Sequence, residues 1–216
     1  MTRVLHAWTA KLALGLGLLL SGGAAVALLA PQAQAHPFET SIYSLRSMVK
    51  VSESGTLTTL VVLEVPVQVV LDGIGVEEDD SRRVKEKKLE SWNTATWDKM
   101  AAGLSLSIDG EPAQGTWRPI EHPANGKGAE GFFVYMVGFD LQQELPAAGY
   151  TLRIENRSYP DEEMVYSGSA TAQGDFKITK DSSREILGTE VDTPLSNPGR
   201  WTKDAKMRDL EVSITR

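Results

Sequence analysis

Cysteine is absent from the 216 residues of this chain, and histidine occurs only three times. Without cysteine there are no disulfide bonds, no thiolate metal ligands and no anchor for a lipid, so side-chain packing has to supply the stability. A cysteine nucleophile is excluded as well, and no G-x-S-x-G segment supports a serine hydrolase. The sequence therefore offers little for nucleophilic catalysis.

The N-terminus has the organisation of a secretory signal peptide. Arg3 and Lys11 give it a positively charged start, and a mostly apolar run follows over 12–29. Ala33 and Ala35 then supply the A-x-A pattern that signal peptidase recognises. We expect cleavage after Ala35 and export of the mature protein to the periplasm or the cell exterior. An uncleaved membrane anchor is the alternative, because about 18 mostly apolar residues nearly span a bilayer.

Export would change the charge balance of the chain. Residues 1–35 contain two of the 22 basic residues and none of the 29 acidic ones, so the mature chain has a formal charge of −9 (20 minus 29). A net negative surface argues against nucleic acids and anionic membranes as partners. The 181 residues that remain suffice for one domain with a substantial core. No second apolar run is long enough to span a membrane, so we expect a soluble mature protein.

The first part of the mature chain has the pattern of a β-hairpin. Residues 38–51 and 56–65 are rich in β-forming side chains, and Ser54 and Gly55 between them indicate a turn. Because proline cannot donate a hydrogen bond to a sheet, Pro66 indicates a strand end, an edge or a bulge.

A charged segment follows, and its spacing predicts a helix over about 81–102. Acidic residues at 77–80 precede basic residues at 82–88, which suits the dipole of a helix. Side chains that would face the sheet recur near helical spacing at Val84, Leu89, Trp92, Thr96 and Met100. Gly103 ends the pattern. We interpret the charged residues as a solvated face of this helix.

Beyond Gly103 the pattern returns to the period of two that is typical of strands. We expect strands over 104–108, 132–141, 150–155 and 210–214, and a late hairpin of 165–170 and 176–179 around Gln173 and Gly174. Residues 181–206 are polar and contain turn formers, so we expect a loop or arm there. The fold class is therefore predicted to be mainly β, an antiparallel immunoglobulin-like β-sandwich over 36–180 with one inserted helix. Residues 181–216 would form a polar arm that ends in a strand.

The order of these pieces resembles the periplasmic N-terminal domain of HupE/UreJ-type and related nickel/cobalt transporter-like membrane proteins. Such domains open with a His-Pro dipeptide, as His36 and Pro37 do, and continue with two β stretches and a helix. A short strand into Asp-Gly is matched by 104–110, and a later Asn-x-x-Tyr segment is matched by 156–159. The resemblance implies a role in metal handling beside a membrane transporter, although the transporter helices have no counterpart in this sequence. The His-Pro opening also resembles CopC-type copper-resistance proteins.

The mature N-terminus would create the best candidate metal ligands. Cleavage after Ala35 gives His36 a free α-amine beside its imidazole, and the two nitrogens can chelate one ion. Because Pro37 has no amide N–H, a site built through successive backbone amides is disfavoured. His122 is the other histidine of the mature chain, and a set of amine, His36 imidazole and His122 imidazole suits Cu(II). We therefore expect Cu(II) or Ni(II) at His36, with His122 as a further candidate ligand.

Two other classes of function stay open. A protein-interaction module of the cell envelope would use sheet edges or the 181–206 arm and no metal. An enzyme would be a His-brace copper oxidase, which needs His36 and His122 to converge, or a hydrolase that uses paired carboxylates. The acidic groups at 77–80 and 161–163 do not follow the spacing of a calcium loop and are interpreted as solvated acids. A function without catalysis is favoured.

Overall fold

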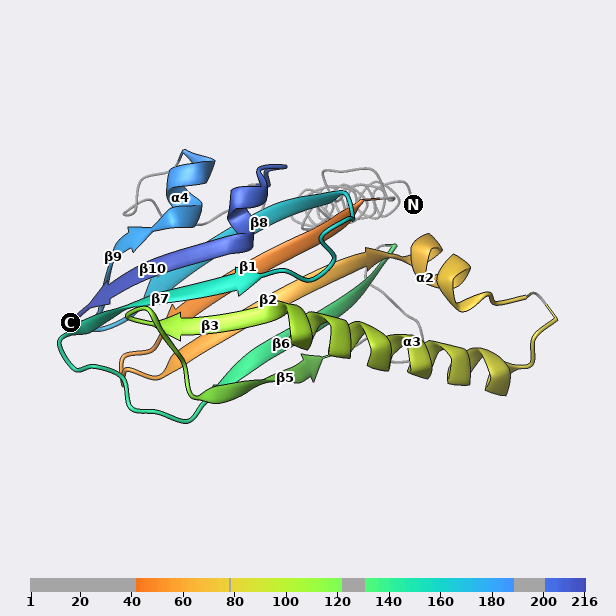
Figure 1. Cartoon of the computed structure of the whole chain (residues 1–216), viewed down its shortest axis with the longest axis horizontal. Helices are drawn as coiled ribbons and strands as arrows, with labels where there is room; N and C mark the ends of the chain where they lie inside the picture. The colour runs from red at the N-terminus through yellow and green to blue at the C-terminus, as the bar shows by residue number, and fades with distance from the viewer. Residues whose placement is uncertain (1–41, 78, 122–130, 189–200) are drawn as a thin grey trace, which may run out of the picture. The chain divides into compact units, whose positions relative to one another are not determined.

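The computed structural model describes residues 42–77, 79–121, 131–188 and 201–216, and they form two five-stranded sheets (Figure 1). The first sheet has the spatial order β5 (Gly115–Glu121), β6 (Phe132–Leu141), β2 (Leu57–Pro66), β1 (Tyr43–Val51) and β8 (Met164–Ala172). The second has the order β4 (Glu111–Pro112), β3 (Leu104–Ile108), β7 (Gly149–Asn156), β10 (Asp209–Thr215) and β9 (Lys177–Asp181). The predicted mainly β sandwich with a helix is confirmed.

The first hairpin is formed by β1 and β2, as the sequence predicts. Their register runs from Ser44 opposite Glu64 to Val51 opposite Leu57. The Gly55 amide donates to the Ser52 carbonyl at 2.9 Å, and Gly55 has a φ of 81° that glycine adopts without strain. The hairpin therefore forms where the turn residues indicate it.

The late hairpin around Gln173 and Gly174 is a wrong prediction. β8 runs parallel to β1 in the first sheet, whereas β9 pairs antiparallel with β10 in the second. The turn therefore carries the chain from one sheet to the other. A turn within a hairpin and a turn between two sheets use the same residue types. Only the strands that pair with the flanking segments distinguish the two. The parallel pair of β1 and β8 also departs from the purely antiparallel arrangement that was expected.

A single core lies between the two sheets. Inward positions alternate along the strands, and the most deeply buried side chains include Leu45, Val61, Leu63, Tyr135, Leu152, Ile154, Val212 and Ile214. Burial of one large apolar side chain contributes about 1.5–3 kcal/mol. In a chain without disulfides this packing is the main source of stability.

The inserted helix is α3 (Arg82–Gly103), one residue from the predicted bounds at each end. The Ser81 hydroxyl caps it by accepting a hydrogen bond from the Val84 amide at 3.4 Å. Its buried side chains all lie in the second half, at Asn93, Thr96, Trp97 and Met100. The charged first half has no buried side chain, in keeping with the predicted solvated face.

A second helix, α2 (Val67–Ile74), was not predicted. It follows β2 directly, with Pro66 at its N-cap and Gly75 in the left-handed conformation at its C-cap. Three valines in eight residues favour a strand on propensity, and tertiary packing overrides this preference: Val70 is buried, and Val67, Val69 and Ile74 pack against the core. Pro66 does end the strand as expected, because a helix begins after it.

The C-terminal region is more ordered than the predicted arm. It contains α4 (Ser182–Leu187) and the 3₁₀ helix η2 (Ala205–Arg208), so the interpretation of 181–206 as a loop is wrong over these residues. Asp181 is fully buried and accepts hydrogen bonds from Ser183 and, at 3.2 Å, from Arg184. Polar residues here are thus paired in the interior instead of solvated. The predicted last strand is confirmed as β10, which lies between β7 and β9.

Candidate functional site

Both sequence-predicted ligands, His36 and His122, lie outside the described residues. The described chain nevertheless fixes where their segments join the sandwich. Ile42 leads into β1, and Glu121 ends β5 immediately before His122. Three antiparallel pairings, β1 with β2, β2 with β6 and β6 with β5, separate these strands, so β1 starts at the end of the sheet where β5 stops (Figure 1).

The carboxylates do not form a metal cluster in the described part of the chain, where no group of three or more His, Asp or Glu side chains is positioned to hold an ion. Asp80 is paired with the Lys88 ammonium at 2.7 Å, and Glu163 with Lys203 at 2.6 Å. The hydrogen bond from Lys88 is the largest reason that the pKa of Asp80 is lowered from its ordinary value. These acids act as partners in surface ion pairs.

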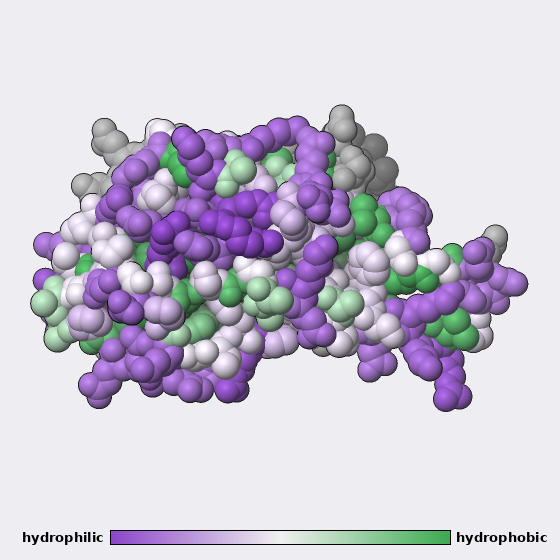
Figure 2. Space-filling view, in the orientation of Figure 1, coloured by the Kyte–Doolittle hydropathy of each residue, from purple (hydrophilic) through white to green (hydrophobic). Residues whose placement is uncertain are grey.

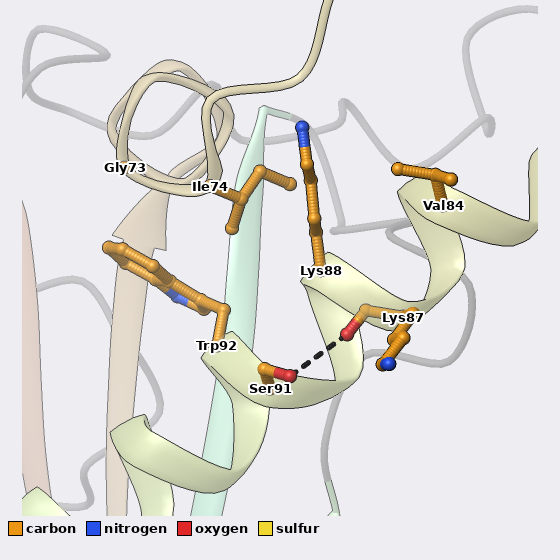
Figure 3. A pocket seen from close by; sticks show the side chains of 7 residues that line it. All are labelled: Gly73, Ile74, Val84, Lys87, Lys88, Ser91 and Trp92. Atoms are coloured by element: carbon orange, nitrogen blue, oxygen red, sulfur yellow. Dashed lines mark hydrogen bonds between the residues drawn. The ribbon is translucent and has the colours of Figure 1, made fainter. Parts of the chain in front are cut away.

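A cleft lies between α2 and α3 (Figure 3). It has a volume of about 440 Å³ and is lined by Gly73, Ile74, Val84, Lys87, Lys88, Ser91 and Trp92. The Trp92 and Lys88 side chains rise from α3 toward α2 in Figure 3. We call this hollow the α2–α3 cleft.

Close packing of a glycine against an aromatic ring forms the base of the cleft. A Cβ atom at Gly73 would lie 2.2 Å from the Trp92 Cζ3 atom, so only glycine lets the indole approach this closely. The Lys88 ammonium closes one end by donating to the Gly75 carbonyl at 2.6 Å and to Asp80 at 2.7 Å. The two helices are therefore held at a fixed separation by one apolar and one polar contact.

Two large hydrophobic residues of α2 and α3 are exposed. Val84, which lines the cleft, is 41% exposed, and Leu71 on α2, which does not line it, is 39% exposed. Figure 2 shows apolar surface among hydrophilic residues over α2 and α3. The cleft lining includes two lysines and no carboxylate. The arrangement can thus hold an apolar group beside a negative charge.

Buried tyrosines lie near the other face of α3, but their chemistry is structural. The Tyr135 hydroxyl donates to Asn93 at 2.8 Å, and Trp97 meets the Tyr135 ring edge-on at 5.8 Å. Burial is the main cause that raises the pKa of Tyr135, and it raises the pKa of Tyr43 to about 12. These phenols stay protonated at neutral pH, so they donate hydrogen bonds and do not act as bases.

No described helix is long and apolar enough to cross a membrane. Comparison with known proteins gives no family assignment, because no family model and no curated protein matches the chain. The likeness to HupE/UreJ-type and CopC-type proteins therefore stays a prediction from sequence motifs. Sequence reasoning missed the α2–α3 cleft, since the cleft depends on a helix that was not predicted. The helical spacing of Val84 and Trp92 was the one available signal.

Proposed function

We propose that this chain is an exported accessory protein, with an immunoglobulin-like sandwich, that binds Cu(II) or Ni(II) through His36 at its mature N-terminus. The signal-peptide pattern that ends at Ala35 supports the location, because cleavage there creates the free α-amine. The observation that carries the proposal is the position of His36 directly after the A-x-A pattern, because cleavage there gives one residue both a free α-amine and an imidazole.

The ligand chemistry fits a nitrogen-binding divalent ion. A terminal amine has an ordinary pKa near 8, so a metal displaces its proton at neutral pH. The amine and imidazole of His36 close one chelate ring, and the imidazole of His122 supplies a third nitrogen of the kind that Cu(II) accepts in tetragonal sites. Pro37 stops the chelate from continuing along the backbone.

The test compares mature protein that begins at His36 with the same protein whose α-amine is acetylated. We expect the acetylated form to bind Cu(II) at least about tenfold more weakly, because its terminal nitrogen can no longer be a ligand of the chelate ring. Isothermal titration and the visible absorption of the bound copper give the affinity and the ligand set. Equal weak binding by both forms would contradict the proposal.

Two variants separate the roles of the histidines. His36→Ala removes the imidazole of the chelate and should abolish tight binding. His122→Ala should weaken binding and shift the copper absorption band if its imidazole is the third ligand. An unchanged band and affinity would remove His122 from the site and leave the chelate at His36.

The α2–α3 cleft favours a second candidate, a protein-interaction module of the cell envelope that works without metal. Exposed apolar residues beside a cleft are typical of docking surfaces. A photo-crosslinking amino acid at position 84 should capture a partner in the presence of a chelator, whereas the same group at the exposed Ile120 should not. Equal capture at both positions would count against a role for the cleft.

A further inference from the structure

One face of α3 forms a continuous stripe along the α2–α3 cleft. The α3 residues that line the cleft are Val84, Lys87, Lys88, Ser91 and Trp92, and their spacing of three, four, seven and eight places them on one side of the helix. Another helix would contact this set of positions if it packed against α3. The stripe is therefore a helix-packing face.

Helix α2 covers only part of this stripe. Gly73 of α2 packs on Trp92, and the carbonyl of Gly75, the C-cap of α2, accepts a hydrogen bond from Lys88. Val84, at the other end of the stripe, is 41% exposed. The first half of α3 has no buried side chain. The part of the stripe around Val84 and Lys87 is thus open to a partner.

The charged side chains at the cleft indicate which kind of partner it can bind. Lys88 is neutralised by Asp80, and Arg82 is paired with Glu86 at 2.7 Å. Lys87 is exposed and forms no ion pair within the described residues. Since the cleft lining contains no carboxylate, the unmatched charge at the cleft is positive. A partner that supplies a carboxylate beside an apolar side chain complements it.

We infer that the α2–α3 cleft is a docking site for an acidic amphipathic helix of a partner protein. One apolar side chain of the partner lies between Ile74, Val84 and Trp92, and a neighbouring Asp or Glu pairs with Lys87. The cleft volume of about 440 Å³ is toward the lower end of the range of about 300–1,000 Å³ that is common for ligand pockets. Recognition of this kind places apolar anchors at helical spacing into a groove. It gives the interaction-module candidate a partner chemistry and is independent of metal binding by His36.

A helix fits this site better than an anionic lipid surface does. Asp79 and Asp80 lie in the connection between α2 and α3, next to the basic residues of α3. An extended anionic surface would meet these carboxylates as well as Lys87, and the mature chain as a whole is negative. A single helix can place one carboxylate at Lys87 and leave the acidic connection in water.

The probe is a labelled helical peptide of about 16 residues with Leu and Phe at helical spacing, one Glu next to this apolar stripe and uncharged polar residues at the other exposed positions. Three comparison probes are the same peptide with Lys in place of Glu, a peptide with its apolar stripe scrambled, and vesicles of anionic phospholipid. Binding to the mature protein is measured by fluorescence anisotropy in the presence of EDTA, which removes any metal effect. The indole N–H signal of Trp92 in nuclear magnetic resonance spectra reports contact at the cleft.

Two exposed positions in the open part of the cleft are changed, each with a matched control elsewhere. Val84→Ser is compared with Ile120→Ser, since both remove an exposed apolar side chain. Lys87→Glu is compared with Lys50→Glu, since both reverse an exposed cation. Circular dichroism confirms that all four variants fold.

We expect the acidic peptide to bind and to shift the Trp92 signal. Lys87→Glu should weaken binding about fivefold to tenfold, because an exposed ion pair is replaced by repulsion. Val84→Ser should weaken it about threefold or more, and the two control variants should bind as the parent protein does. Equal losses in the control variants, equal binding of the basic peptide, a preference for vesicles or no peptide binding at millimolar concentration would each overturn the inference.

Discussion

Arg208 is the polar centre that holds the C-terminal segment to the sandwich, and its replacement should be strongly destabilising. The side chain is buried, with 9% of the residue exposed. Its guanidinium donates to the Ser158 carbonyl at 2.7 Å, to the Tyr159 carbonyl at 2.9 Å and to the Tyr166 hydroxyl at 3.0 Å. Tyr159 has a φ of 50°, so these bonds also fix an unfavourable turn.

The change Arg208→Met keeps most of the side-chain length and removes every donor. The buried Ser158 carbonyl then loses its hydrogen bond, and an unsatisfied buried group costs about 1–3 kcal/mol. The Tyr159 carbonyl loses its shorter bond and keeps the one from the Glu162 amide at 3.4 Å. The loss of the contact with Tyr166 adds to this cost, and relief from burying a charge offsets part of it. We expect the free energy of unfolding to fall by about 3–5 kcal/mol.

Urea unfolding followed by tryptophan fluorescence measures the change. Arg153→Met is the matched control, because the Arg153 side chain is 44% exposed and pairs on the surface with Glu155 at 2.8 Å and Asp209 at 3.4 Å. An exposed ion pair contributes at most about 1 kcal/mol, so the control should lose little stability. The reasoning is refuted if Arg208→Met unfolds within about 1 kcal/mol of the parent protein or loses no more than the control.

The remaining predictions concern two buried tyrosines that differ in their hydrogen-bond partners and one glycine in close contact with the backbone. The Tyr150 hydroxyl has no hydrogen-bond partner within the described residues, so Tyr150→Phe should leave the free energy of unfolding unchanged or raise it by up to about 1 kcal/mol. Tyr135→Phe should lower the free energy of unfolding by about 1 kcal/mol, because the hydrogen bond to Asn93 is lost. Burial raises the pKa of Tyr150 to about 12, so the folded state keeps this proton above pH 10 and the free energy of unfolding falls as pH rises from about 10 to 12. Tyr150→Phe should reduce that alkaline loss in urea titrations at pH 7 and 11, and an identical loss in both proteins would contradict the assignment. Gly103→Ala should lower the free energy of unfolding by about 1–3 kcal/mol in the same assay, because the new Cβ atom would lie 2.4 Å from the Ser158 amide nitrogen. A gain in stability would contradict this, since it would show that the backbone moves apart without cost.

Periodicity predicted correctly the helices and strands in which the spacing of apolar residues matches the side chains that are buried. Residues 132–141 form β6 over the predicted bounds, and the helix over 81–102 differs from α3 by one residue at each end. Helix α2 was missed because its valines favour a strand, and Val70 is helical through its tertiary contacts. The destination of β9 was missed for a similar reason, since the turn before it does not specify which sheet receives the next strand.

The sequence predicts the metal ligands, whereas the structure is needed to find the α2–α3 cleft. Ligand chemistry can be inferred from residue types, so His36 and His122 were predicted as ligands from the sequence, and this stays a prediction because both lie outside the described residues. The α2–α3 cleft depends on shape instead. It requires Gly73 to admit the Trp92 ring, and these residues are far enough apart in sequence that no periodic pattern connects them.

Helix α2 lies at the end of the sandwich from which β1 starts. Helix α2 begins where β2 ends, and β2 runs antiparallel to β1, so α2 starts at the end of the sheet where β1 also starts. The Val67 amide donates to the Gly131 carbonyl at 2.9 Å, which ties the first residue of α2 to the residue that follows segment 122–130. Connections at one end of a rigid sheet are the usual place for binding residues. The hydrogen-bonded sheets and the Arg208 centre therefore act as the scaffold, and functional differences are expected at the end where β1 and α2 start.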